Sequence, residues 1–494
     1  MGIKRFFAEK DNTITNAFEA NLTTRGTGSN MGAADILEVF SIYAQASSSA
    51  GLSNEKSRAI IQFPVDDITN ARSTGQIPAS GSVSFYLKLA NARHGQTLPK
   101  GFTLVTAPVS GAAWTEGEGL DMENYSDIGV SNWISASEGV GWQTEGGDYY
   151  SASEVSQLFD KGTEDLEINV TSIVEDWIAG TVPNYGFGVF LTSSEENSTS
   201  RSYYTKKFFS RTSEFFFKRP VVEARFNATV QDDRGNFFYS SSLASAEENL
   251  NTIYLYNRVR GRLRNIPSIG TGNIYVSVFS GSTEPTGSAI DLVADGTHVL
   301  PGDLTVVTGE HVSTGIYKAT FAATAAATPL DTLFDVWHNS DLTVQFKTGS
   351  ITPLTLDASS EAYAERYINK ITNLKPEYFT DETARFRVYT RPRNWQPNIY
   401  TVAQQRPETT IIPSSSFSVY RIADDQSVIP FGTGSDLHTV MSYDSRGNYF
   451  DLDISMLEPD YAYGIELCHY NDYTGGWDIQ EEVFKFRVEK RQTK

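Results

Sequence analysis

The stretch Ser82-Val83-Ser84-Phe85-Tyr86-Leu87-Lys88-Leu89-Ala90 alternates apolar and polar side chains along its whole length. Successive side chains of a β-strand point to opposite faces, so the four large apolar residues share one face. A run of this kind predicts a half-buried antiparallel strand. The same alternation recurs at residues 272–281, 316–322, 384–391 and 481–489. The pattern predicts an all-β protein.

One segment departs from this alternation. Residues 171–180 place Ile173, Val174, Trp177 and Ile178 on a helical stripe, which predicts a short helix with Trp177 in the core. Ser172 and Glu175 have the spacing of a capping box at its start. Gly180 is a natural stop.

The length of 494 residues suits about three domains. Residues 219–226 are predicted to be the last strand of a first domain. The polar stretch 231–236 follows them and marks a first boundary. Pro376 precedes a new series of alternating strands and marks a second. We therefore expect three consecutive β-sandwich modules, at 1–227, 228–374 and 375–494. The last two have lengths typical of immunoglobulin-like (Ig-like) sandwiches.

Charge and hydropathy argue against several classes of function. The formal net charge of -20 repels phosphate backbones and anionic membranes, so neither nucleic acid nor a membrane is expected as a partner. No run of about 18 apolar residues occurs, and the start Met1-Gly2-Ile3-Lys4-Arg5 is not expected to be a secretion signal. The single cysteine, Cys468, excludes disulfides within the chain and is predicted to be a buried strand residue.

Motifs that carry catalysis or bind cofactors are missing from the sequence. There is no Gly-Lys dipeptide, no Gly-x-Gly-x-x-Gly and no Gly-x-Ser-x-Gly, and the six histidines are scattered. Asp444, Asn448, Asp451 and Asp453 form an acidic cluster whose spacing fails the EF-hand pattern, so a solvated hairpin is preferred to a Ca²⁺ site. No catalytic residue, metal or cofactor is predicted, and the protein is expected not to be an enzyme.

Two groups of residues are candidates for contacts with other molecules. Trp114, Trp133 and Trp142 lie in loops rich in Gly, Ser and Glu, where exposed rings would stack on sugars. The alternative, which we favour, is that these rings close the ends of the sandwich or are buried against a neighbouring subunit. The N-terminal segment Ile3, Lys4, Arg5, Phe6 and Phe7 is a candidate docking strand, although such termini are often folded back onto their own domain.

The N-terminal module resembles the DNRLRE-type β-sandwich family through an ordered series of short sequence features. They are Lys10-Asp11-Asn12-Thr13-Ile14, residues 35–39, residues 57–63, the strand at 82–90, Trp114-Thr115-Glu116-Gly117-Glu118-Gly119, Trp142, the helix with Trp177, Tyr185-Gly186-Phe187-Gly188-Val189, and Phe208-Phe209-Ser210-Arg211 with Arg219-Pro220. The match covers residues 1–227. It implies a β-sandwich of the kind that serves as a non-catalytic binding or spacer module, and it brings no catalytic residues.

The whole chain also resembles virion structural proteins of marine T4-like tailed phages, particularly those of cyanophages. The residues that carry this second likeness are Met1-Gly2-Ile3-Lys4-Arg5-Phe6, Tyr204-Thr205-Lys206-Lys207-Phe208-Phe209, Phe215-Phe216-Phe217-Lys218-Arg219-Pro220, Tyr254-Leu255-Tyr256-Asn257, Phe334-Asp335-Val336-Trp337-His338 and Gly447-Asn448-Tyr449-Phe450-Asp451-Leu452-Asp453. It implies a particle component, made in the host cytoplasm, that assembles with other virion proteins and with copies of itself in the tail, baseplate or neck. The alternative is a module that binds a host receptor or surface glycan.

Overall fold

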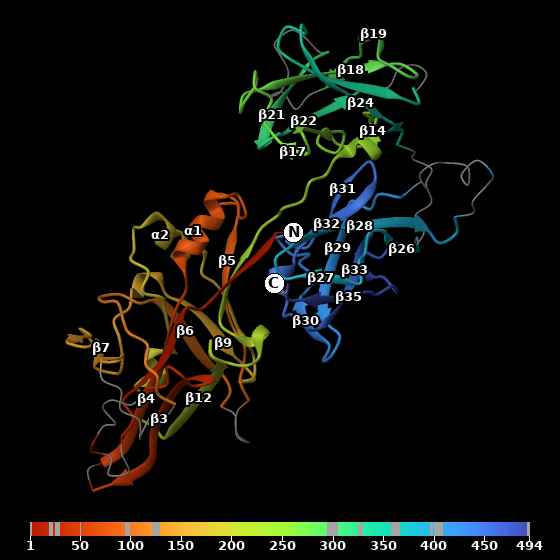
Figure 1. The fold of residues 1–494 in the computed structure, drawn as a ribbon. Coiled ribbons are helices and arrows are strands. Elements are labelled where there is room, and N and C mark those ends of the chain that lie inside the picture. The colour runs from red at the N-terminus through yellow and green to blue at the C-terminus, as the bar shows by residue number, and fades with distance from the viewer. Residues whose placement is uncertain are drawn as a thin grey trace. The chain divides into compact units, whose positions relative to one another are not determined.

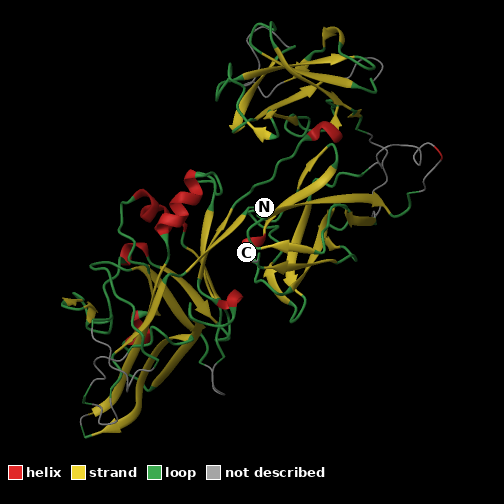
Figure 2. Ribbon diagram, in the orientation of Figure 1, coloured by secondary structure: helices red, strands yellow, loops and turns green. Residues whose placement is uncertain are grey.

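A computed structural model represents the chain and describes residues 2–18, 23–24, 30–49, 51–93, 99–120, 129–293, 305–324, 330–356, 366–395, 399 and 409–491. Strands hold 47% of the chain and helices 8%, as the predominance of yellow arrows in Figure 2 shows. The all-β class is confirmed. Contacts divide the chain into two compact units, one of Gly2–Asn227 with Thr433–His438 and one of Ala228–Gly432 with Thr439–Lys494.

The first unit contains the N-terminal sandwich, which has two main antiparallel sheets (Figure 1). One sheet has the order β1 (Ile3–Phe7), β13 (Val221–Arg225), β5 (Ser84–Leu89) and β10 (Leu166–Asn169). The other has the order β12 (Ser202–Phe209), β3 (Ile36–Ser48), β4 (Gly51–Gln62), β11 (Phe187–Leu191), β6 (Phe102–Pro108) and β9 (Val155–Phe159), with β2 (Lys10–Thr15) also paired to β4. A small hairpin joins β7 (Ser135–Ser137) to β8 (Val140–Gly141).

The predicted central strand is confirmed as β5. Phe85, Leu87 and Leu89 are fully buried, whereas Tyr86 and Lys88 on the other face are partly exposed. Burying an apolar side chain of this size contributes about 1.5–3 kcal/mol, so this one face anchors the sheet to the core.

The N-terminal sandwich also carries short helices. They are α1 (Val65–Ser73), α2 (Thr171–Ala179), α3 (Ser193–Glu196) and the 3-10 turns η1 (Ser151–Ser153) and η2 (Phe216–Lys218). Helix α2 confirms the predicted segment, because Ile173, Val174 and Trp177 are buried and Gly180 ends it with a φ of 70°. Sequence reasoning missed α1, whose exposed face is polar.

The predicted capping box at the start of α2 is wrong. The N-cap residue is Val170 and makes no side-chain capping hydrogen bond. Glu175 instead accepts two hydrogen bonds from Arg72 of α1, at 2.6 and 2.7 Å. A bidentate Arg–carboxylate pair is stronger than a neutral cap, so this tertiary contact prevails over the local one.

The second unit begins with a sandwich whose main strands follow the order β15 (Asn251–Tyr256), β22 (Ile316–Ala323), β21 (Val307–Ser313), β18 (Ile274–Ser280), β23 (Leu333–His338) and β24 (Gln345–Ile351). Strand β21 pairs with β18 through its first half and with β22 through its second half, so it connects β15 and β22 to β18, β23 and β24. The shorter elements are η3 (Asp233–Gly235), β14 (Phe237–Phe238), β16 (Arg258–Val259), β17 (Arg262–Leu263), β19 (Thr286–Ala289), β20 (Leu292–Val293) and β25 (Pro353–Leu354).

The core of this middle sandwich confirms two predicted strands. Ile274, Val276 and Val278 of β18 meet the aromatic residues of β22, Tyr317 and Phe321, in one buried cluster. All five side chains are fully buried. Residues 316–323 therefore form a strand, as their alternation predicts, although the segment contains Ala319, Ala322 and Ala323 and alanine favours helices.

The C-terminal sandwich of the same unit has two sheets. One has the order β26 (Tyr367–Ile371), β28 (Thr383–Pro392), β32 (Gly447–Asp453) and β31 (Ser442–Asp444). The other has the order β27 (Glu377–Phe379), β35 (Phe484–Glu489), β33 (Ala462–Asn471), β29 (Ser415–Arg421) and β30 (Gln426–Ile429), with β34 (Gly476–Ile479) beside β33 and the turn η4 (Ile454–Met456) between strands. Strand β26 pairs with β28, so this sandwich includes β26, which precedes the expected boundary near Pro376.

Candidate functional site

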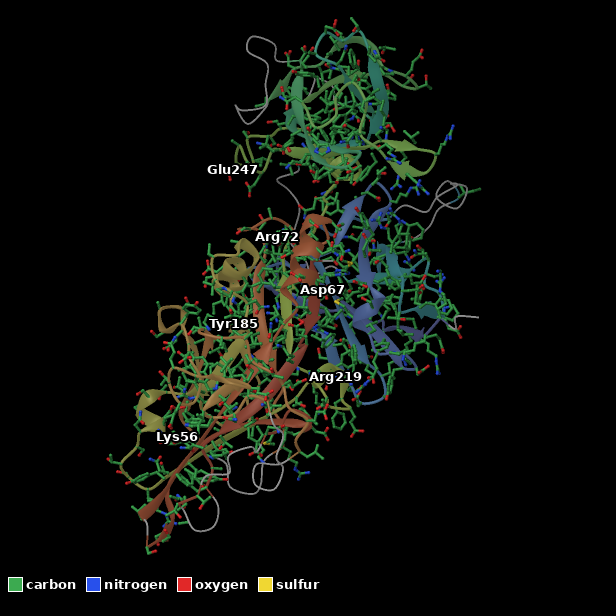
Figure 3. The ribbon with its side chains drawn as sticks, turned by 60° about the vertical axis from the view of Figure 1, so that its left-hand side comes forward. Lys56, Asp67, Arg72, Tyr185, Arg219 and Glu247 are labelled. Carbon is green, nitrogen blue, oxygen red and sulfur yellow. The ribbon has the colours of Figure 1, made fainter. Side chains whose placement is uncertain are left out.

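A polar pocket of about 410 Å³ lies in the N-terminal sandwich. Its wall is one face of β4, where Asn54, Lys56 and Arg58 alternate with inward-facing residues. Lys56 is labelled in Figure 3. The remaining lining residues come from β11, α3 and nearby loops, and they are Asn16, Trp133, Glu145, Phe190, Leu191, Ser193, Glu196 and Asn197.

A buried ion pair fixes one side of the pocket. Nε and Nη2 of Arg58 donate hydrogen bonds to the two carboxylate oxygens of Glu196, at 2.9 and 2.6 Å. The side chains of Arg58 and Glu196 are only 16% and 5% exposed. The guanidinium carbon lies 5.4 Å from the ring centre of Trp133 and 5.0 Å from that of Phe190. A bidentate pair held between aromatic rings has little rotational freedom, so this wall is pre-formed.

The loop before β9 closes against the same arginine. Nη1 of Arg58 donates a hydrogen bond to the carbonyl of Gly146 at 3.0 Å. Gly146 has a φ of 89°, and a Cβ atom there would lie 2.8 Å from the Trp133 ring. Only glycine combines this backbone conformation with such a close approach. The position of Trp133 at the pocket therefore depends on Gly146.

The charges of the pocket balance. Lys56 and Arg58 face Glu145 and Glu196, so the lining carries no net charge. Nζ of Lys56 donates a hydrogen bond to Oδ1 of Asn197 at 2.9 Å. Burial lowers the pKa of the Lys56 ammonium, the nearby Arg58 lowers it further, and the carboxylate of Glu196 opposes both. The pocket is therefore polar without being selective for either sign of charge.

The three loop tryptophans are buried rather than exposed. Trp114, Trp133 and Trp142 retain 2%, 7% and 8% of their surface and share one cluster with Ile14 and Ile60. The indole N–H of Trp114 donates to the carbonyl of Tyr185, and that of Trp142 donates to the carbonyl of Asn132. The rings are packed inside this cluster, so the premise of exposed rings fails. Only Trp133 lines the pocket.

The N-terminal segment Ile3, Lys4, Arg5, Phe6 and Phe7 forms β1, the edge strand of the four-stranded sheet. It pairs with β13 along its whole length, and Ile3 and Phe6 are buried. The segment is thus folded back onto its own domain. Its removal would take away a sheet strand, so deletion of these residues is not a clean test of docking.

A second polar cluster lies where the middle and C-terminal sandwiches meet within the second unit, and we call it the joint. Its centre is Arg234 of η3, whose guanidinium pairs with Asp335 at 2.6 Å and with Asp232 at 2.9 Å. Asp335 is fully buried and also accepts a hydrogen bond from the indole N–H of Trp337. The hydroxyl of Tyr443, on β31 of the C-terminal sandwich, donates to Asp233 at 2.7 Å.

The backbone reinforces the joint. Residue 232 donates its N–H to the carbonyl of Tyr443, and Tyr443 donates its N–H to the carbonyl of Val230. Burial raises the pKa of Asp232 to about 6 although Arg234 opposes this shift. Two similar sequences, Asp233-Arg234-Gly235-Asn236 and Ser445-Arg446-Gly447-Asn448, meet here, because a Cβ atom on Gly235 would lie 3.0 Å from Cα of Ser445.

The remaining sequence candidates are engaged in structural contacts. Asp444 accepts two hydrogen bonds from Arg387, Asp451 accepts two from Arg385, and Asn448 exchanges hydrogen bonds with the backbone of Ile412. Asp453 caps η4. Cys468 is buried, and burial raises its thiol pKa to about 12. Among the described residues, no group of three or more His, Cys, Asp or Glu side chains is placed to hold a metal ion.

Sequence reasoning missed the pocket because its residues are far apart in the chain. One signal was available, since Thr192-Ser193-Ser194-Glu195 is a capping box and it starts α3, which supplies Glu196. The contact between Glu196 and β4 depends on the sheet order, which the sequence does not reveal.

No protein-family model matches the chain, and no curated protein matches it. Among solved structures it is similar to the tandem Ig repeats of Dlar and to the N-terminal Ig1-2 module of the Drosophila receptor protein tyrosine phosphatase DLAR. Each match has 10% sequence identity and covers 49% of this chain and 90% of the other, with TM-scores of 0.13 and 0.14. Because these TM-scores are low, the fold is described from the sheets and cores of the chain itself. None of the described helices has the length and apolar character needed to cross a membrane.

Proposed function

We propose that the chain is a non-enzymatic structural component of a tailed-phage virion, in the tail, baseplate or neck. It acts by assembling with other virion proteins and with copies of itself after synthesis in the host cytoplasm. The virion part of this proposal is supported by the resemblance of the whole chain to such proteins. The structural part is supported by the joint.

The joint is the observation that best supports the proposal, because buried ion pairs hold neighbouring segments of the chain in fixed positions. Arg234 contacts Asp232, Asp335 and the carbonyl of Tyr254, so the segment that enters the middle sandwich is held at one position. Replacing a buried ion pair by apolar residues is often neutral for stability, whereas removing one partner costs about 3–5 kcal/mol. A network of this kind is suited to setting the orientation of two domains, which a spacer in a particle requires.

The test combines a variant of the joint with a matched control in the full chain. Arg234→Met leaves two buried carboxylates without their cation, and we expect faster hydrogen exchange in residues 229–238 and 440–446. We also expect less of the variant in purified particles when it replaces the wild-type protein. Arg385→Met removes a half-exposed pair with Asp451 and serves as the control.

Equal exchange in the two variants would contradict the role of the joint. Absence of the wild-type protein from purified particles would contradict the virion proposal itself. If the wild-type protein is present in particles, locating its density in a particle map would identify its neighbours.

A further inference from the structure

Two polar groups of the pocket on β4 have no hydrogen-bond partner among the residues that the structure describes. They are the side-chain amide of Asn54 and the indole N–H of Trp133, and neither group belongs to the fully buried unpaired atoms. The indole N–H groups of Trp114 and Trp142, in contrast, both donate to backbone carbonyls. Among the described residues, Trp133 is thus the ring of the three that borders the pocket and whose indole N–H has no protein acceptor.

The other lining groups offer both donors and acceptors. The ammonium of Lys56 uses one hydrogen for Asn197 and has three in all. The carboxylate of Glu196 is held by Arg58 and retains further lone pairs. A sugar hydroxyl both donates and accepts, and the C–H groups of a sugar ring can contact aromatic carbons, which Trp133 and Phe190 contribute to the lining beside Arg58.

The balance of charge narrows the ligand class. Two cationic and two anionic side chains line the pocket, so a uronate or phosphate would meet carboxylates and an amine would meet Lys56 and Arg58. The volume of about 410 Å³ falls at the lower end of the range of about 300–1,000 Å³ found for small-molecule sites. A small neutral polyol satisfies both conditions.

We propose that this pocket binds a neutral saccharide of one or two rings, with its hydroxyls on Asn54, Lys56 and the Trp133 N–H and its C–H face against Phe190. The Arg58–Glu196 pair is a positioning element that holds the wall in place. This site goes beyond the assembly proposal and does not depend on it, because a protein that takes part in assembly can carry or lack a sugar site.

The experiment uses the full chain on an array of neutral, acidic and amino sugars, followed by calorimetric titration with the best neutral hit. We expect neutral glycans to bind at least about tenfold more tightly than matched uronates, a difference of about 1.4 kcal/mol. Asn54→Trp fills the pocket from an exposed strand position and is expected to weaken binding at least about tenfold. Leu52→Trp, two residues away on the same face of β4 but outside the lining, is the matched control and is expected to leave binding unchanged.

Three outcomes would overturn the sugar site: no binding of any glycan by the folded protein, preferential binding of uronates, or equal binding by the Asn54→Trp and Leu52→Trp variants. Release of reducing ends from a bound polysaccharide would leave the sugar site standing and contradict the non-enzymatic part of the proposed function. Failure of the chain to enter particles would leave the binding result unaffected.

Discussion

Glu223 on β13 is expected to contribute more to the stability of the N-terminal sandwich than any exposed carboxylate of that sheet. Its side chain is 1% exposed and lies among three cations, Arg5 at 2.7 Å, Arg225 at 2.7 Å and Lys88 at 3.6 Å. Burial alone would raise the pKa of Glu223, but the attraction of these cations outweighs burial and lowers the pKa from 4.5 to about 2.

The contribution of Glu223 to the free energy of unfolding follows from the difference between its pKa values in the unfolded and folded states. The pKa falls by about 2.5 between the unfolded and folded states, and at 1.36 kcal/mol per pH unit this corresponds to about 3 kcal/mol. Because the folded pKa is the lower one, this stabilisation is fully present above pH 4.5 and is lost as the pH falls toward 2. About 2 kcal/mol should remain at pH 3.5.

Glu223→Gln keeps the shape of the side chain and removes its charge. We expect the free energy of unfolding of the N-terminal sandwich to fall by about 3 kcal/mol at pH 7, and the difference from wild type to shrink on acidification. The control is Glu167→Gln, because Glu167 also contacts Arg225 and Lys88 but is 43% exposed, so solvent screening reduces its expected effect to about 0.5 kcal/mol.

The assay is urea unfolding of the full chain, followed by hydrogen exchange in peptides that cover β1, β5 and β13. These peptides report on the sheet that contains Glu223 and separate its unfolding from that of the other sandwiches. Equal losses in the Glu223 and Glu167 variants, or a loss in the Glu223 variant that does not change between pH 7 and pH 3.5, would refute the reasoning.

Three further predictions concern single side chains. Burial raises the pKa of Asp11 to about 7, so its ionisation lowers stability as the pH rises from about 4 to 7, and Asp11→Asn should flatten this part of a plot of melting temperature against pH. Gly186→Ala places a Cβ atom 2.2 Å from the carbonyl oxygen of Ile61 and should cost at least about 2 kcal/mol, whereas Gly180→Ala, which meets no atom within 4 Å, should cost about 1 kcal/mol; similar melting temperatures of the two variants would contradict this. Cys468 is 1% exposed and burial raises its pKa to about 12, so iodoacetamide should label it only after unfolding; rapid labelling of the folded chain would disprove its burial.

Alternation in the sequence predicted the strands well because burial on one face imposes it directly. Phe85, Leu87 and Leu89 could be placed on the core face from the order of residues alone, and all three are fully buried. The same holds for Phe386 and Val388 of β28. Helix α1 was missed because only Ile68 and Ala71 are buried in it, too few to establish a helical period.

The sites were harder to predict because they depend on charges that are far apart in the chain. Arg58 and Glu196 are separated by 138 positions, and Arg234 and Asp335 by 101. Each of these residues looks like an ordinary surface charge in the sequence. The sequence places the three tryptophans in loops, but the burial of their rings depends on packing against Ile14 and Ile60 of β2 and β4.

Glu223, the Arg58–Glu196 pair and the joint share one arrangement, a carboxylate removed from water and held by arginine. Taking such charges out of water offsets part of what their attraction returns, so each pair contributes less to the free energy of unfolding than its attraction alone would give. They do penalise every arrangement that separates the partners, because an unpaired buried charge costs several kcal/mol. The three clusters respectively fix the register of β1 on β13, the wall of the pocket and the contact between two sandwiches. The buried pairs therefore lie where a change of strand register, of the pocket wall or of the contact between the two sandwiches would leave a charge unpaired.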